Sequence, residues 1–227
     1  MRPIYCTIPR RSLAIVALVC AAAFTALAVY VWSSPDGTAI EGHITDAITS
    51  TTKDGTYRLF NAISALGSTG AVAVGAVVLA IFAFWWWRNV RLAVVCVLGP
   101  ALAGAGEIVI KKVIGRPRPP TAGLSGEGGF SFPSGHASGA TALAVVIVLL
   151  AFAAFPRRHP LRVVLVVAAV LYAVAIAVSR VVIGAHLPYD VLGGALLGTV
   201  ATLVAILVLL PERATANGLA RSTALPR

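Results

Sequence analysis

The sequence predicts an all-α integral membrane protein built as a bundle of six transmembrane helices. Hydrophobic residues make up 59% of the 227 residues and charged residues only 11%, and the mean hydropathy is +0.92. A soluble domain of this length needs far less apolar material to form one core, so this composition is typical of a protein in a bilayer. Apolar stretches of about 20 residues also recur along the chain, and that length crosses a hydrocarbon layer of roughly 30 Å.

The six expected spans follow one another along the chain. They cover residues 12–32, 66–87, 91–110, 136–155, 162–180 and 190–211. The first apolar run continues past Cys20 to Trp32, so we expect an uncleaved span rather than a processed leader. Trp32 and the tryptophans at 85–87 lie at span ends, where such residues form aromatic belts at the membrane surface.

The first loop, residues 33–58, carries an amphipathic pattern. Four apolar residues recur at intervals that place them on one helix face. They are Ile40, Ile44, Ala47 and Ile48. We therefore expect a short interfacial helix in this loop, lying on the outer leaflet.

Proline and glycine set the ends of the later spans. Three prolines in the stretch 115–120 follow the third span. Because a helix cannot continue through them, Arg118 is expected on a loop. The Pro-Ser-Gly sequence at 133–135 precedes the fourth span and is typical of a helix start. Pro188 falls in the expected first turn of the sixth span, where proline is well accommodated.

The distribution of Lys and Arg predicts the orientation, because cytoplasmic segments carry the excess of positive charge. With the N-terminus inside, the cytoplasmic segments hold 11 of the 18 Lys and Arg residues. We therefore expect a multi-pass protein of the cell membrane with both termini in the cytoplasm. No internal repeat or second domain is visible. Residues 1–211 are expected to form a single domain, and residues 212–227 a basic, disordered cytoplasmic tail.

The formal net charge of +10 does not indicate a nucleic-acid-binding protein, because the cations lie in short gaps between apolar runs. Five of the seven outer cations are concentrated in two short loops, against the general bias. They are Lys111, Lys112, Arg116, Arg118 and Arg180. Their concentration predicts an anionic ligand at the outer face.

Three clusters of polar residues fall at the outer ends of the spans. The first is Lys111 followed by Arg118-Pro119, the second is Pro133-Ser134-Gly135-His136, and the third is Ser179-Arg180, His186 and Asp190. In this order they match the tripartite signature of the type-2 phosphatidic acid phosphatase family. The chain thus resembles a bacterial membrane member of that family. The resemblance covers about residues 60–211, with the signature region at about 107–195.

The cations of the signature suit phosphoryl transfer on chemical grounds. A phosphoryl group in transfer spreads negative charge over three oxygens and needs fixed cations and N–H donors. Lys111, Arg118 and Arg180 can supply that positive charge. Lys111 could instead only complement the C-terminus of the third span. Lys112 and Arg116 lie outside the signature, and we expect surface or lipid-headgroup roles for them.

The remaining signature residues suit phosphate binding and nucleophilic attack. Ser134 and Gly135 stand at a helix start, where a hydroxyl and a backbone N–H can bind phosphate, although Ser134 could serve only as an N-cap. His186 and Asp190 are four residues apart, which puts both side chains on one helix face. A carboxylate that accepts one ring N–H directs the other nitrogen toward a substrate. The resemblance implies that His186 is the nucleophile, forming a phosphohistidine, and that His136 is the general acid.

The resemblance implies a lipid phosphatase that hydrolyses a lipid phosphate or diphosphate at the extracytoplasmic face. Undecaprenyl diphosphate, phosphatidylglycerol phosphate and phosphatidate remain open as substrates. The two histidines and the aspartate, with Glu107, could instead hold a metal, but nearby cations would repel a divalent ion, so we expect neither metal nor cofactor. The alternatives are a phosphotransferase with the same signature and a non-enzymatic anion-binding protein or transporter. Expected partners are the lipid substrate and membrane lipids, and no nucleic acid.

Overall fold

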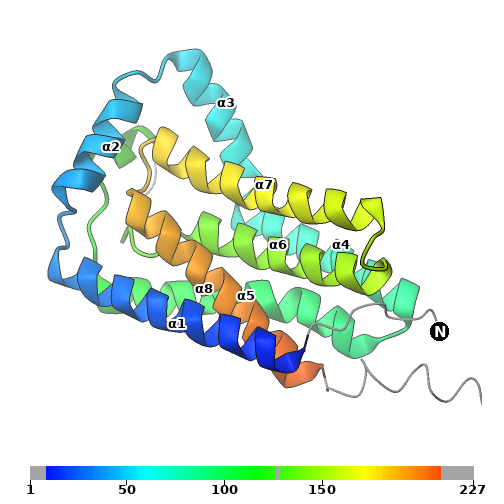
Figure 1. The fold of residues 1–227 in the computed structure, drawn as a ribbon. Helices are drawn as coiled ribbons and strands as arrows, with labels where there is room; N and C mark the ends of the chain where they lie inside the picture. Colours follow the sequence, from blue (N-terminus) through cyan, green and yellow to red (C-terminus); the bar gives the residue numbers. More distant parts are fainter. Residues whose placement is uncertain (1–8, 126–127, 211–227) are drawn as a thin grey trace, which may run out of the picture.

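The chain folds into helices throughout the part that the structure, a computed structural model, describes, which is residues 9–125 and 128–210. The described residues form no strand. The helices are α1 (Arg10–Ser33), α2 (Ala39–Thr49), α3 (Asp54–Ala65), α4 (Thr69–Trp87), α5 (Val90–Ile114), η1 (Pro120–Ser125), α6 (Gly135–Ala154), α7 (Pro160–Val182) and α8 (Pro188–Leu209). Figure 1 shows the long helices running side by side as a bundle.

Six of these helices are long and apolar enough to cross a membrane, and they correspond to the six expected spans. They are α1, α4, α5, α6, α7 and α8. The prediction of an all-α bundle with six spans is therefore confirmed. The largest shift at an end concerns α5, which extends four residues beyond the expected limit of 110 and includes Lys111. Gly115 ends α5 in the left-handed conformation (φ 66°), which glycine adopts without strain.

Helices α6 and α8 form the centre of the bundle. About half of the most apolar window of each is buried, 56% in α6 and 50% in α8, against 11% in α1 and in α7. Glycines let the two central helices approach closely. A Cβ on Gly194 would lie 2.4 Å from the carbonyl oxygen of Ser134, and one on Gly198 would lie 2.2 Å from that of Ser138. The start of α6 is therefore held directly against α8.

The segment between α1 and α4 contains two helices, α2 and α3, where the sequence predicted one. A capping box begins α2, in which Thr38 and Glu41 each accept a backbone N–H from the other residue. The helix exposes Ile40 and Ile44 and buries Glu41 and Thr45. Apolar residues are thus exposed and polar residues buried, the opposite of a helix on a soluble protein. This arrangement fits a helix whose exposed face touches lipid, but its position at the membrane surface stays a prediction.

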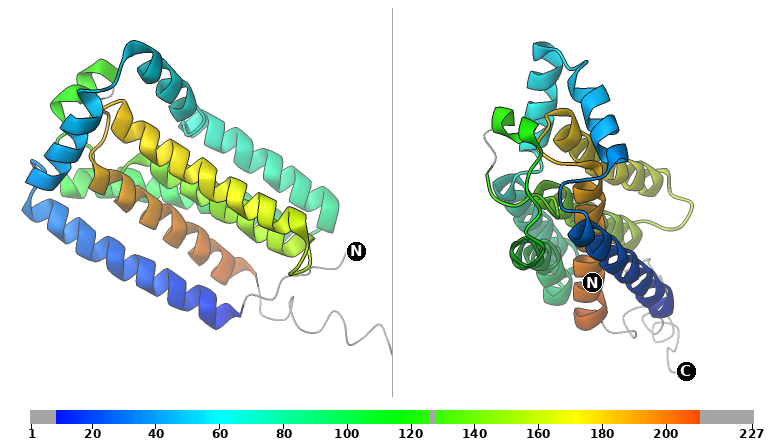
Figure 2. Two further views of the ribbon diagram at one scale, coloured as in Figure 1. Left: turned by 45° about the horizontal axis from the view of Figure 1, so that its top comes forward. Right: turned by 90° about the vertical axis from the view of Figure 1, so that its left-hand side faces the viewer.

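Several spans end at the same end of the bundle, next to α2 and η1 (Figure 1). These are the C-terminal ends of α1, α5 and α7 and the N-terminal ends of α6 and α8. Figure 2 shows α2 and α3 crossing this end from α1 toward α4. All three polar clusters of the sequence lie here, because each is attached to one of these helix ends.

Candidate active site

A short turn between α7 and α8 presents His186. Gly184 takes a left-handed conformation (φ 71°) in this turn, where a residue with a side chain would be strained. The hydroxyl of Thr121 donates to the carbonyl of Gly184 at 2.9 Å, and the N–H of His186 donates to the carbonyl of Arg180 at 3.2 Å. His186 itself is 1% exposed. The turn therefore holds the imidazole in a fixed place inside the protein.

The carboxylate of Asp190 lies beside the imidazole, although His186 stands in the turn before α8 and not on a shared helix face as predicted. His186 Nδ1 is 3.6 Å from Asp190 Oδ2. The same oxygen accepts a hydrogen bond from the N–H of Leu187 at 2.9 Å and another from the hydroxyl of Ser131. Ser131 Oγ is also 3.3 Å from His186 Nδ1. Ser131 thus contacts both members of the His186–Asp190 pair.

The other ring nitrogen of His186 faces a cation. Arg118 Nη1 lies 3.3 Å from His186 Nε2. A guanidinium can only donate hydrogen bonds, so this contact requires an unprotonated Nε2 with its lone pair toward Arg118. The proton then belongs on Nδ1, toward Asp190 and Ser131. This tautomer leaves the free lone pair of the ring on Nε2.

The surroundings of His186 keep the imidazole neutral at pH 7. Burial lowers its pKa most strongly, and Asp190 partly opposes this effect. The positive charges of Arg118 and Arg180 lower it further, to about 4 from the ordinary 6.5. A neutral imidazole retains the lone pair that attack on phosphorus requires.

Arg118 and Arg180 are both anchored near His186. Arg118 donates to the carbonyls of Gly128 and Ala185, each at 3.0 Å. Arg180 is 2% exposed, and its Nη1 donates to the hydroxyl of Ser64 at 2.6 Å. The structure therefore brings the cations of two separate sequence clusters to the same imidazole.

Lys111 lies at the end of α5, beside the start of α6. Its Nζ is 2.7 Å from Glu107 Oε1, one helical turn earlier. A Cβ on Gly135 would lie 2.5 Å from that same oxygen, so Glu107 joins Lys111 to Gly135. His136 follows in the first turn of α6 and is half-buried. Lys111, Gly135 and His136 thus belong to one corner of the site.

Ser134 connects that corner with the imidazole. Its backbone N–H donates to the carbonyl of Asp190 at 2.9 Å. Its side chain does not cap α6, and its buried hydroxyl has no hydrogen-bond partner among the described residues. A buried hydroxyl costs free energy unless it is bonded. The Ser134 hydroxyl is therefore a candidate ligand group rather than an N-cap.

The prediction of a surface or lipid-headgroup role for Arg116 is wrong. Its side chain is fully buried and forms ion pairs with Glu41 at 2.6 Å and with Asp190 Oδ1 at 2.6 Å. Burial alone would lower the pKa of the guanidinium, but the bonds to Glu41 and Asp190 outweigh burial and raise it. Arg116 is thus a permanent internal cation that holds Asp190.

The sequence did not identify Ser131 and Ser64, which contact Asp190 and Arg180, or Glu41, which binds Arg116. Ser131 could have been suspected from the sequence, because it stands only three residues before Ser134 of the signature. The capping pattern from Thr38 to Glu41 predicts a helix start, yet nothing in it reveals that Glu41 is buried. Glu107 was considered only as a metal ligand, whereas the structure pairs it with Lys111.

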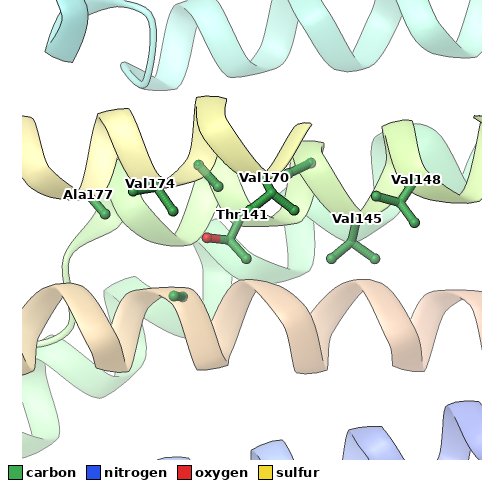
Figure 3. A pocket seen from close by; sticks show the side chains of 9 residues that line it. Thr141, Val145, Val148, Val170, Val174 and Ala177 are labelled. Atoms are coloured by element: carbon green, nitrogen blue, oxygen red, sulfur yellow. The ribbon is translucent and has the colours of Figure 1, made fainter. Parts of the chain in front are cut away.

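Two hollows lie near the polar site. An apolar one of about 310 Å³ is lined by α6, α7 and α8, and Figure 3 shows Val170, Val174 and Ala177 of α7 around it, with Thr141 and Val145 of α6. Its end at Ala177 is three residues from Arg180 along α7. The other, of about 300 Å³, is more polar and is lined by residues from the end of α2, from α3, from η1 and from the end of α7.

Comparisons with known proteins agree with this architecture. The model of the PAP2 superfamily matches residues 90–213. Phosphatidylglycerophosphatase B of Bacillus subtilis (strain 168) is 42% identical over 92 residues, which is 40% of this chain and 44% of that protein. The match therefore spans less than half of that relative's length.

Two solved structures share the fold. The transmembrane PAP2-type phosphatidylglycerolphosphate phosphatase from Bacillus subtilis superposes with a TM-score of 0.73 at 24% identity, covering 83% of this chain and 93% of that one. Aquifex aeolicus LpxE superposes with a TM-score of 0.59 at 24% identity, covering 75% and 97%. At these identities the likeness establishes the arrangement of the helices.

Proposed function

This chain belongs to the PAP2 superfamily, the type-2 phosphatidic acid phosphatases, and from that premise we propose that it is a membrane lipid phosphatase. It hydrolyses a lipid phosphate or diphosphate, with His186 as the nucleophile. The observation that carries the proposal is the environment of His186. The imidazole is neutral, Asp190 faces Nδ1 at 3.6 Å, and Arg118 stands 3.3 Å from Nε2.

The reaction proceeds in two balanced steps. Nε2 of His186 attacks phosphorus, the bond to the leaving oxygen breaks, and His136 donates a proton to that oxygen. Water then attacks the phosphorus of the phosphohistidine, His136 takes a proton from the water, and the bond between phosphorus and Nε2 breaks to release inorganic phosphate. Asp190 stabilises the positive charge that the His186 ring carries in the intermediate.

Fixed positive groups stabilise the phosphoryl oxygens during transfer. Arg118 and Arg180 approach from the His186 side, and Lys111 approaches from the end of α5. Ser134 and Gly135 add a hydroxyl and a backbone N–H at the positive end of α6. Because Arg118 and Arg180 are already anchored in place, they need little reorganisation when the charge develops. The reaction as proposed needs no metal and no cofactor.

The substrate is proposed to carry hydrocarbon chains. The polar site lies at the ends of helices that are apolar enough to cross a membrane, and the apolar hollow begins one helical turn from Arg180 (Figure 3). Phosphatidylglycerol phosphate, undecaprenyl diphosphate and phosphatidate all fit this description. The name of the curated relative, phosphatidylglycerophosphatase B, favours testing phosphatidylglycerol phosphate first.

The site is proposed to face the extracytoplasmic side, with both termini in the cytoplasm and residues 1–211 as a single domain. The Lys and Arg distribution supports this orientation. Arg157 and Arg158 are exposed in the turn between α6 and α7. This turn lies at the opposite end of the bundle from His186. The basic tail at 212–227 lies outside the described residues.

A substrate panel tests the proposal. The full chain, purified in detergent, is given the three lipid phosphates and a water-soluble phosphate ester, each with and without a chelator. We expect phosphate release from lipid substrates, unchanged by the chelator. The release should be lost in His186→Ala while the thermal stability of that variant stays normal. Lipid cleavage that survives this substitution contradicts the proposal. Phosphate found on a lipid or sugar acceptor, instead of free in solution, would identify a phosphotransferase.

A further inference from the structure

The carboxylate of Glu107 stands at the corner of the site where the proposed function places substrate phosphate. It lies one turn before Lys111 on α5, and the two side chains form an ion pair with Oε1 2.7 Å from Nζ. Both side chains are about one-fifth exposed, at 20% and 19%. Most of the Glu107 side chain is therefore covered by the protein.

The same carboxylate lies against the first residue of α6. A Cβ on Gly135 would be 2.5 Å and 2.6 Å from the two oxygens of Glu107 and 2.6 Å from its Cδ. The carboxylate thus covers the Cα of Gly135, and glycine is the residue that leaves room for it. The start of a helix attracts anions through its free N–H groups and its dipole.

An independent feature marks this corner as a ligand site. The Ser134 hydroxyl next to Gly135 is fully buried and has no hydrogen-bond partner among the described residues. A cation, a helix start and an unsatisfied buried hydroxyl therefore converge where a carboxylate already stands. A phosphate oxygen bound by Lys111 and Gly135 would meet Glu107 at close range, and two anions there repel each other.

We infer that Glu107 competes with phosphate for Lys111 and the start of α6, so that it must turn away for the phosphate to bind. This inference rests on the proposed function, because it assumes that the site binds phosphate. Only molecules in which Glu107 has left Lys111 can bind phosphate. The apparent association constant for phosphate is therefore the intrinsic constant multiplied by the fraction of such molecules. Glu107 also replaces the product on Lys111 after hydrolysis, which favours the release of inorganic phosphate.

Removing the charge of Glu107 while keeping its size tests the competition. In Glu107→Gln we expect inorganic phosphate and orthovanadate to bind about tenfold more tightly, which corresponds to about 1.4 kcal/mol. Phosphate should also become a stronger product inhibitor. Asp46→Asn is the matched control, because it removes one negative charge from an exposed position on α2. That control should leave the affinity for both anions unchanged.

The measurement is the thermal stability of the full-length protein in detergent, titrated with phosphate or vanadate, since this reports binding without turnover. Equal affinities in wild type and Glu107→Gln, or weaker binding in the variant, overturn the role of Glu107 while the phosphate site stands. No stabilisation of any variant by either anion contradicts the proposed phosphate site itself. Glu107→Asp provides a second variant if the amide unfolds the protein. Its carboxylate is one methylene shorter and reaches Gly135 less well, so tighter anion binding is expected there too.

Discussion

Arg116 Nη1 lies 2.6 Å from Asp190 Oδ1, and neither side chain is exposed. The same guanidinium binds Glu41 of α2 through two hydrogen bonds. Arg116 therefore connects the first loop with the carboxylate that faces His186. Two buried carboxylates share this one cation, so the balance of charge depends on it.

The first prediction concerns the stability that this arrangement provides. Arg116→Met leaves Glu41 and Asp190 buried without their cation, and breaking such a pair costs about 3–5 kcal/mol. The double variant Glu41→Gln/Arg116→Met removes one of the two charges, so it should be more stable than the single variant. Unfolding in detergent measures the order of stability. Arg91→Met, at an exposed position, should stay within about 0.5 kcal/mol of wild type, and an equally small loss at Arg116 would contradict the prediction.

The role of Arg116 also shows what the sequence leaves undetermined. The six spans could be predicted because length and hydropathy are properties of one stretch of chain at a time. The signature residues could be placed because each cluster is attached to a span end. The partners of Arg116 are 75 residues away in one direction and 74 in the other. No spacing rule relates such positions, so a residue beside a recognised motif was assigned to the surface.

The first loop was predicted only in part, for a different reason. Its apolar pattern correctly predicts a helix at α2, but the buried face of that helix is formed by Glu41 and Thr45. Hydrophobic periodicity identifies which residues share a face without showing which face is turned inward. Helix α3 was missed because its polar and apolar residues form no run long enough to resemble a span. The burial of Glu41 and Thr45 could not be predicted, because tertiary contacts rather than local sequence decide it.

The second prediction follows from the pKa of His186, which burial and the neighbouring arginines lower to about 4. Between pH 6.5 and 4 the unfolded chain binds a proton on this side chain and the folded protein does not, so the stability falls as the pH drops through this window. Relative to the non-titrating variant His186→Gln, wild type should lose about 3 kcal/mol between pH 7 and pH 4. Unfolding in detergent across this range provides the measurement. Parallel stability curves for the two proteins would show that His186 titrates normally.

The third prediction concerns the cations that face the phosphoryl group. Arg180→Ala should lower turnover about 10²-fold or more, because the charge it stabilises is largest in the transition state. Ser64→Ala removes the hydroxyl that accepts from Arg180 and should cost about tenfold or less, the value of one hydrogen bond. Vanadate should inhibit wild type. Arg157→Ala is the control, because Arg157 is exposed at the other end of the bundle. Near-normal turnover in Arg180→Ala would show that Arg180 is not part of the proposed phosphate site.

The fourth prediction tests the orientation in the membrane. The Cβ of Gly128→Cys enters open space, and Arg157 is exposed at the opposite end of the bundle. In a background without Cys6, Cys20 and Cys96, a membrane-impermeant thiol reagent applied to intact cells should label the cysteine at 128 and leave the one at 157 unlabelled. Both should react after the membrane is permeabilised. The reverse pattern in intact cells would place the site at the cytoplasmic face.

The last prediction separates the two histidines by the leaving group. A monoester expels an alkoxide, whereas a diphosphate expels a lipid phosphate, a weaker base that needs less help from an acid. His136→Ala should therefore slow monoester cleavage by about 10²–10⁴, the usual contribution of a general acid, while attack on a diphosphate suffers less. His186→Ala should abolish both reactions, because no nucleophile remains.

Hydrolysis of the intermediate then distinguishes the roles further, because the water that clears the phosphohistidine must lose a proton and His136 is the proposed base. A radiolabelled diphosphate lipid should leave acid-labile, base-stable label on His136→Ala protein, and the label should persist when excess unlabelled substrate is added. The double variant His136→Ala/His186→Ala should carry no label, because it lacks the imidazole whose Nε2 faces Arg118 and is the proposed nucleophile. Label on the double variant would remove His186 as the nucleophile. Absence of label from both variants, with diphosphate cleavage intact in His136→Ala, would mean that a group other than His136 activates the water.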